Sequence, residues 1–299
     1  MHVLNKSGLD QPLVSMCIPV FNHERFVEHS IKSIIQQTYQ NIELIIIDDG
    51  SSDASTRVIE GLLDACERRF VRFCYIAREN RGLSRTLNQA LEWSKGKFFS
   101  ALASDDRILP EKTAFLVSYL EKQPECVAAF GSIYLIDDDG VRGAARIRSG
   151  KYGFKEVITL KAELPAVSGM LRPDKLLAVG GFNVNTRVED WDMWLKLTCA
   201  SGEYLEALPE VVAEYRQHPD NTLKQLDLMY DQQVKILENY SGTAEFSEAE
   251  VALRCVRFRN IATSRKAQAL SLFLSLMTKP SAYKEIRFYQ GIVHLFLKW

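Results

Sequence analysis

Short apolar runs alternate with amphipathic segments along the first hundred residues of the chain. The apolar runs have the length of β-strands and cover residues 13–20, 42–47, 71–76 and 97–103. The segments between them repeat apolar side chains at helical spacing and cover residues 23–35, 54–69 and 84–93. Asn22 is the predicted N-cap of the first helix. This alternation predicts an α/β fold with a parallel, doubly wound sheet.

After Pro110 the pattern becomes less regular and predicts a mixed sheet. The expected helices cover residues 111–122 and 188–199, and the expected strands cover residues 127–136, 165–171 and 211–215. A loop with Pro219, Asp220 and Asn221 follows the last strand. From residue 222 onward the pattern predicts a helical region that continues to the end of the chain.

Two of the apolar runs end at paired carboxylates. Asp48 and Asp49 follow the second run, and Asp105 and Asp106 follow the fourth. The carboxyl ends of parallel strands meet at one edge of the sheet, where ligands bind in open α/β folds. Carboxylates gathered there need a metal ion, or the hydroxyl and amide donors of a ligand. The pattern therefore predicts an enzyme that handles a nucleotide and a metal.

Composition narrows the class of protein. The chain has 299 residues, 46% hydrophobic and 25% charged, as expected for a folded protein with a substantial core. A net charge of −1 gives no indication of nucleic-acid binding. The six cysteines lack metal-site spacing, so reduced thiols in the cytoplasm are expected. We find no signal peptide and no apolar segment near the roughly 20 residues that span a bilayer.

A series of short motifs occurs in order between residues 13 and 221. They are Val14–Asn22, Gln36–Tyr39, Ile47–Asp53, Asn80–Ser84 with Asn88, Ser104–Asp106, Gly180–Phe182, Glu189–Asp190 and Tyr215–Pro219. In order and spacing, the series resembles the family 2 inverting glycosyltransferases of GT-A fold. The resemblance implies a catalytic domain over residues 1–221, with a nucleotide-sugar half at about 13–106 and an acceptor half at about 107–221. Residues 222–299 lie outside it, as a C-terminal helical region.

The resemblance places a nucleotide-sugar donor at the ends of the first strands. Phe21 would offer a ring face to the base, and Asp49 would accept a hydrogen bond from the imide N–H of uracil or thymine. The other residues implied in donor binding are Pro19, Val20, Asn22, Arg81, Ser104 and Asp105. Helix capping and turn formation are the alternative roles of Asp48 and Asp49.

The resemblance also implies a divalent cation, Mn²⁺ or Mg²⁺, that bridges the donor diphosphate. Asp106 is the expected direct ligand. His218 is expected to bind the metal or donate to the diphosphate, and Arg216 to neutralise phosphate charge. The family motif commonly begins with an acid where this chain has Ala103. This departure weakens the case for tight metal binding, and an exposed acidic loop is the alternative.

Inversion at the anomeric carbon requires a base that removes the proton of the acceptor hydroxyl. The resemblance assigns this role to Asp190, with Glu189 orienting it or binding the acceptor. The alternative is that both acids complement the dipole of the helix that they begin. Trp191 is the candidate for stacking on an acceptor sugar, although its spacing with Trp194 fits a packed core equally well.

The implied reaction moves one sugar from a UDP- or dTDP-donor to a hydroxyl of a glycan or lipid-linked saccharide. Rhamnose, glucose, galactose and N-acetylglucosamine are the candidate sugars, and lipopolysaccharide or another surface polysaccharide is the expected product. The absence of a Q-x-x-R-W motif favours a non-processive enzyme. The alternatives are a sugar-1-phosphate nucleotidyltransferase, whose glycine-rich loop is not found at Pro19–His23, and a non-catalytic binding scaffold, which only Ala103 favours.

The C-terminal region carries an excess of positive charge. Between residues 251 and 299 there are nine Lys and Arg and one acid, Glu285. The basic residues that alternate with apolar ones at helical spacing are Arg254, Arg257, Arg265 and Lys266, and the apolar ones are Val251, Cys255, Phe258, Ala262 and Phe273. Such a segment suits an anionic membrane surface, here the inner face of the cytoplasmic membrane. Packing against the catalytic domain or a partner subunit is the alternative.

Overall fold

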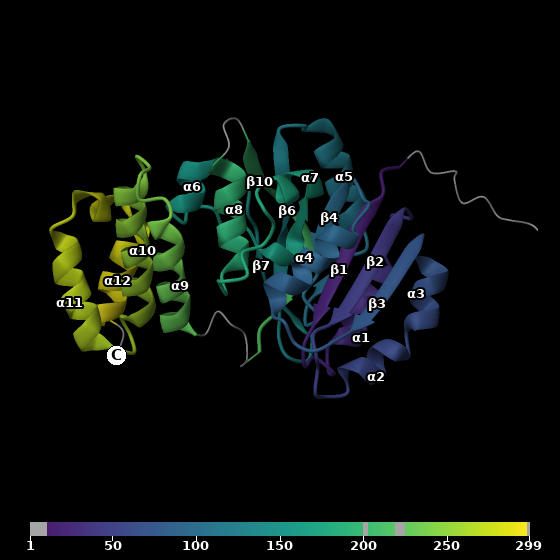
Figure 1. The fold of residues 1–299 in the computed structure, drawn as a ribbon. Coiled ribbons are helices and arrows are strands. Elements are labelled where there is room, and N and C mark those ends of the chain that lie inside the picture. Colours follow the sequence, from purple (N-terminus) through teal and green to yellow (C-terminus); the bar gives the residue numbers. More distant parts are fainter. Residues whose placement is uncertain (1–10, 200–202, 219–224, 298–299) are drawn as a thin grey trace, which may run out of the picture. The chain divides into compact units, whose positions relative to one another are not determined.

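The computed structural model describes residues 11–199, 203–218 and 225–297. Its main element is a sheet with the strand order β3-β2-β1-β4-β9-β6-β10-β5 (Figure 1). These strands are β1 (Val14–Val20), β2 (Ile42–Asp48), β3 (Arg72–Ala77), β4 (Phe98–Ala101), β5 (Arg107–Ile108), β6 (Cys126–Ile136), β9 (Gly169–Leu171) and β10 (Tyr204–Arg216). Two short strands, β7 (Arg142–Arg146) and β8 (Gly150–Tyr152), pair with β6 and β10. This mixed, mostly parallel sheet confirms the predicted fold class.

The first four strands form the predicted parallel part of the sheet. β1 pairs in parallel with β2 and β4, and β2 pairs in parallel with β3. The connecting helices are α1 (Val27–Ile35), α2 (Ser55–Glu60), α3 (Leu63–Arg69) and α4 (Leu83–Trp93). The single helix expected over residues 54–69 is two helices, because the chain breaks at Gly61 and Leu62. Asn22 is not an N-cap: it has a left-handed φ of 54°, and its side chain accepts the N–H of Ser52 at 2.8 Å.

The second part of the sheet is mixed, as predicted. β9 pairs in antiparallel fashion with β4 and β6, whereas β10 is parallel to β6 and antiparallel to β5. Helices α5 (Lys112–Lys122) and α7 (Pro173–Ala178) belong to this part. β10 begins seven residues before the predicted strand, since the register shifts between Ala207 and Val211 let the strand continue past Pro209.

The chain divides into two compact units, which we describe separately. The sheet unit comprises residues 11–151, 164–185 and 196–218 within the described ranges. The helical unit comprises residues 152–163, 186–195 and the described residues after 224, so it also takes two segments that precede residue 221. Its helices are α6 (Phe154–Ile158), the start of α8 (Glu189–Cys199), α9 (Leu226–Glu238), α10 (Phe246–Ile261), α11 (Lys266–Met277) and α12 (Ile286–Leu297).

The apolar positions expected to face a membrane form the core of the helical unit instead. Cys255, Phe258 and Ala262 are fully buried, and Phe273 stacks on Phe288 with ring centroids 5.9 Å apart. These positions therefore pack among the C-terminal helices themselves, which neither the membrane expectation nor its alternative had foreseen. Among the described residues, no helix is both long enough and apolar enough to cross a membrane.

Candidate functional site

Three parallel strands of the sheet unit end at the same edge and carry the predicted donor-binding residues. β1 and β2 are joined there by a hydrogen bond from the Asp49 N–H to the Val20 carbonyl, 2.8 Å long. Pro19 pairs with Ile47 within these strands. Phe21 follows β1 and remains 48% exposed, so its ring is accessible to a ligand.

Asp49 organises the loop that precedes α4. Its carboxylate is buried, accepts the N–H groups of Arg81 at 2.9 Å and Gly82 at 2.8 Å, and pairs with Arg78. Gly82 has a φ of 88°, which favours glycine at this turn. Asp48 accepts hydrogen bonds from the Ser51 N–H and the Thr56 hydroxyl, which is the turn role foreseen as its alternative. A carboxylate offers about four acceptor positions, so Asp49 can accept one further donor.

His23, Asp105 and His218 converge next to this edge. One ligand atom from each lies within 4.8 Å of the other two. Nε2 of His218 is 2.9 Å from a carboxylate oxygen of Asp105, and Nδ1 of His23 is 2.7 Å from the Ser104 hydroxyl. Two imidazoles and a carboxylate suit Mn²⁺ better than Mg²⁺, which prefers oxygen ligands. The donor set therefore fits the implied transition metal.

Of these three residues, His218 was expected at a metal site, Asp105 was expected to contact the donor, and His23 was missed. The signal for His23 is its place in the loop directly after β1, at the edge where Asp105 follows β4. A histidine three residues beyond a buried strand end is close enough to that edge to reach a ligand there.

Asp106 lies outside this group. It is 2% exposed, and its Oδ1 accepts the backbone N–H of Arg216 at 2.7 Å. Burial, together with the neighbouring Asp105, raises the pKa of Asp106 well above its usual range. The geometry therefore favours Asp105 over the expected Asp106 as metal ligand, because Asp106 is outside the cluster and one of its carboxylate oxygens already accepts a hydrogen bond from the β10 backbone.

Arg216, which was expected to neutralise phosphate charge, is buried, and its guanidinium binds backbone carbonyls. Its Nε donates to the Asp105 carbonyl at 2.8 Å, and its Nη1 donates to the carbonyls of Asp137 at 2.9 Å and Asp138 at 2.8 Å. The guanidinium also lies over the Phe26 ring, 4.6 Å from its centroid. Burial lowers the pKa of Arg216. The side chain thus ties the loop after β4 to the turn after β6.

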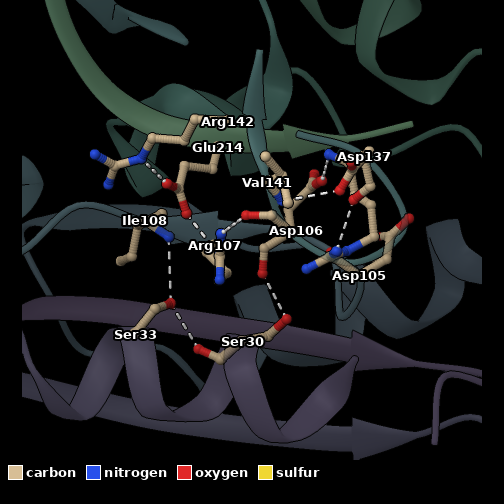
Figure 2. Close-up of polar contacts among 12 residues, drawn as sticks. Ser30, Ser33, Asp105, Asp106, Arg107, Ile108, Asp137, Val141, Arg142 and Glu214 are labelled. Carbon is tan, nitrogen blue, oxygen red and sulfur yellow. Dashed lines mark hydrogen bonds and ion pairs between the residues drawn. The ribbon is translucent and has the colours of Figure 1, made fainter. Parts of the chain in front are cut away.

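Further polar contacts hold the loop after β4 from both sides (Figure 2). From α1, the Ser30 hydroxyl donates to the Asp106 carbonyl at 2.6 Å. From β10, Glu214 forms ion pairs with Arg107, at 2.6 Å, and with Arg142. These contacts fix the backbone that presents Asp105.

The two candidate catalytic acids begin α8 in the helical unit. Burial raises the pKa of Glu189 and of Asp190, and the charge of Asp190 raises that of Glu189 further. Asp190 accepts the backbone N–H of Trp191 at 2.7 Å. Trp191 is itself buried, and its indole N–H donates to the Val157 carbonyl at 2.9 Å. Its packing alternative is favoured over stacking on an acceptor, since little of the ring is exposed.

Comparison with known proteins identifies the relatives of this chain. A model described as glycosyl transferase family 2 matches residues 15–173, more than half of the chain. An uncharacterized glycosyltransferase of Rickettsia prowazekii is 28% identical over 225 residues, which cover 73% of this chain and 68% of that protein. One from Methanocaldococcus jannaschii is 27% identical over 225 residues, covering 73% and 76%.

Two solved structures match the fold over nearly the whole chain. S. aureus TarS 1–349 in complex with UDP-GlcNAc has a TM-score of 0.63 at 15% identity and covers 95% of this chain and 81% of TarS. The mannosyltransferase PcManGT from Pyrobaculum calidifontis, in complex with GDP-Man and Mn²⁺, has a TM-score of 0.62 at 14% identity and covers 97% and 88%. The fold is of GT-A type, and with the family match this chain belongs to glycosyl transferase family 2.

Proposed function

We propose that the protein is a non-processive inverting glycosyltransferase that moves one sugar from a UDP- or dTDP-sugar to a hydroxyl of a glycan acceptor. The observation that carries the proposal is the convergence of three features at one sheet edge. These are an exposed aromatic ring at Phe21, a carboxylate with remaining acceptor capacity at Asp49, and the cluster of His23, Asp105 and His218. The ring of Phe21 can stack on the base of a donor, and Asp49 can accept its imide N–H. The cluster can hold a metal ion that binds the diphosphate.

Recognition of the base rests on Phe21 and Asp49. A ring that is 48% exposed can stack on a base, and Asp49 can accept the imide N–H of a pyrimidine. Pro19, Val20 and Asn22 line the same strand end, and the exposed Arg81 side chain is free to approach a phosphate. TarS was solved with UDP-GlcNAc and PcManGT with GDP-Man, so both base types occur on this fold. The donor sugar remains one of rhamnose, glucose, galactose and N-acetylglucosamine.

We assign metal binding to Asp105, His23 and His218, in place of Asp106. A bound Mn²⁺ would neutralise charge on the leaving diphosphate. Ser104 holds His23 through its hydroxyl, and Arg216 holds the backbone of Asp105, so both ligands are oriented by neighbouring groups. This is the arrangement expected of a preorganised site.

Asp190 is the proposed base and Glu189 its partner. A carboxylate whose pKa lies above the usual range takes up a proton more readily near neutral pH. At the start of α8 the helix dipole favours the charged forms, so burial at both acids, together with the Asp190 charge at Glu189, must outweigh it for the pKa values to rise. The acceptor proton would pass to Asp190 as the hydroxyl attacks the anomeric carbon.

The acceptor is proposed to be a glycan or lipid-linked saccharide of lipopolysaccharide or another surface polysaccharide. The second candidate function is a non-catalytic nucleotide-binding scaffold, which Ala103 favours because the family motif commonly has an acid there. The scaffold should bind a nucleotide but transfer no sugar.

A nucleotide panel tests the proposal. UDP or dTDP with Mn²⁺ should raise the melting temperature by several degrees, since a ligand at 100 times its Kd stabilises by about 2.7 kcal/mol. GDP and ADP should raise it less. The nucleotide that binds then selects the nucleotide-sugars for a transfer assay. A larger shift with GDP would overturn the base assignment, and binding of every donor without transfer or hydrolysis would support the scaffold.

A further inference from the structure

Helices α11 and α12 each expose a stripe of apolar side chains in addition to the face that they bury. On α11 the exposed residues recur at helical spacing, and on α12 they do the same over almost its whole length. The α11–α12 apolar surface consists of Leu270, Leu274, Met277, Tyr283, Ile286, Tyr289, Val293, Phe296 and Leu297, each between 43% and 75% exposed. Contiguous apolar surface of this extent marks an interaction site.

The two stripes are joined through Tyr283. Its hydroxyl donates to the Met277 carbonyl at 2.8 Å, and its own carbonyl accepts the Tyr289 hydroxyl at 3.0 Å. The helices also lie beside each other, and Phe273 of α11 contacts the Phe296 ring of α12 at a centroid distance of 5.8 Å (Figure 1). The stripes therefore form one surface.

The exposed charged residues within residues 263–297 are all basic. Within residues 263–297 the one acid is Glu285, which is 5% exposed and pairs with Lys161 and Arg287. Lys279 and Lys284, by contrast, are exposed on the segment that connects α11 to α12. Within residues 263–297 the apolar side chains, tyrosines and lysines are thus combined without an exposed acid, and the nearby Asp227 of α9 is paired with Arg257 and Arg265.

We propose that the α11–α12 apolar surface binds the interface of an anionic lipid bilayer. Aliphatic side chains would enter the boundary between headgroups and acyl chains, the tyrosines would lie at headgroup level, and the lysines would meet lipid phosphates. A second copy of this chain suits the surface less well, because a symmetric contact brings the lysines of one copy close to those of the other. The proposal does not depend on sugar transfer.

Flotation with lipid vesicles tests this surface on the full chain. The protein should float with vesicles of phosphatidylcholine mixed with phosphatidylglycerol, and much less with phosphatidylcholine alone. Leu274→Glu combined with Val293→Glu should lower the partition coefficient on the order of tenfold or more for each side chain withdrawn. Lys279→Gln and Lys284→Gln should each lower the partition coefficient about fivefold. The contribution of the lysines to binding should become smaller as the salt concentration rises.

The matched control is Leu177→Glu, because Leu177 is 54% exposed on α7 in the sheet unit. It should float like the wild type. All substituted side chains are exposed, so circular dichroism melting should be unchanged. Equal flotation of the Leu274→Glu, Val293→Glu variant and the wild type would overturn the proposal, as would a wild type that fails to float with anionic vesicles. A wild-type dimer that the double variant converts to a monomer would assign the surface to a second copy instead.

Discussion

Replacing Asp105 by Asn should weaken Mn²⁺ binding far more than the same replacement at Asp106. The two substitutions replace adjacent carboxyl groups by amides and keep the size of each side chain. In the described part of the chain, Asp105 belongs to the cluster with His23 and His218, whereas the Asp106 carboxylate accepts the Arg216 N–H at 2.7 Å. Comparing the two variants therefore distinguishes a metal ligand, Asp105, from a buried residue that stabilises the loop, Asp106.

The expected magnitudes follow from what each side chain contacts. Asn at position 105 keeps an oxygen but removes the one anionic ligand beside two imidazoles. Loss of a second-shell partner alone typically lowers metal affinity 10–100-fold, so this change should exceed about 100-fold, or about 2.7 kcal/mol. Asn at position 106 keeps the size of the side chain and can still accept the Arg216 N–H. We expect Asp106→Asn to lower the free energy of unfolding by about 1 kcal/mol and the metal affinity by about tenfold or less.

Electron paramagnetic resonance of free Mn²⁺, titrated with protein at a constant saturating concentration of UDP, measures both affinities directly. Thermal unfolding of each variant without metal is the control for folding. A 100-fold loss in Asp106→Asn together with wild-type affinity in Asp105→Asn would refute this assignment. Wild-type affinity in both would place the metal elsewhere. His23→Ala should cost at least about tenfold and tests the ligand that the motifs did not indicate.

The remaining predictions concern catalysis and a buried lysine. Asp190→Asn should lower kcat by about 10²–10⁴-fold while calorimetric nucleotide affinity changes little, and unchanged turnover would move the base to Glu189. Burial lowers the pKa of Lys112 from 10.5 to about 7, with Asp106 opposing part of the shift. Between these values the unfolded chain binds the extra proton, so stability should rise with pH by up to about 1.4 kcal/mol per pH unit. Lys112→Met should remove that part of the slope in urea unfolding across this range, and equal slopes would contradict it.

The parallel part of the sheet was predictable because β1 and β2 are covered on both faces. All seven residues of β2 are buried, and apart from Glu43 the strand appears in the sequence as an apolar run that ends at Asp48. The carboxylates that follow such runs mark the strand ends, which places Asp49 and Asp105 at one edge. Helix continuity was less predictable, because the apolar spacing runs through Gly61 although α2 ends one residue earlier.

The C-terminal helices show why helical spacing does not by itself identify the exposed face. In α11, Ala269 and Leu276 are fully buried, whereas Leu270 and Leu274 are exposed. Because α11 has apolar residues on both faces, their spacing in the sequence does not distinguish the buried face from the exposed one. The basic residues on either side of Cys255 suggested that this segment lies at a membrane surface, yet Cys255 is in the core of the helical unit.

The roles of the two acids after β4 depend on a residue that is 110 positions away in the sequence. Asp105 lies in a turn where the Asp106 N–H donates to the Ala103 carbonyl at 3.1 Å, and the two acids contact different partners beyond it. The backbone N–H of Arg216 in β10 donates to the Asp106 carboxylate. The Arg216 guanidinium donates to three backbone carbonyls, those of Asp105, Asp137 and Asp138. Asp106, expected to bind the metal, and Arg216, expected to neutralise phosphate charge, therefore hold the loop that presents Asp105. Substitution at Arg216 should accordingly act through the position of Asp105 and not through loss of a ligand.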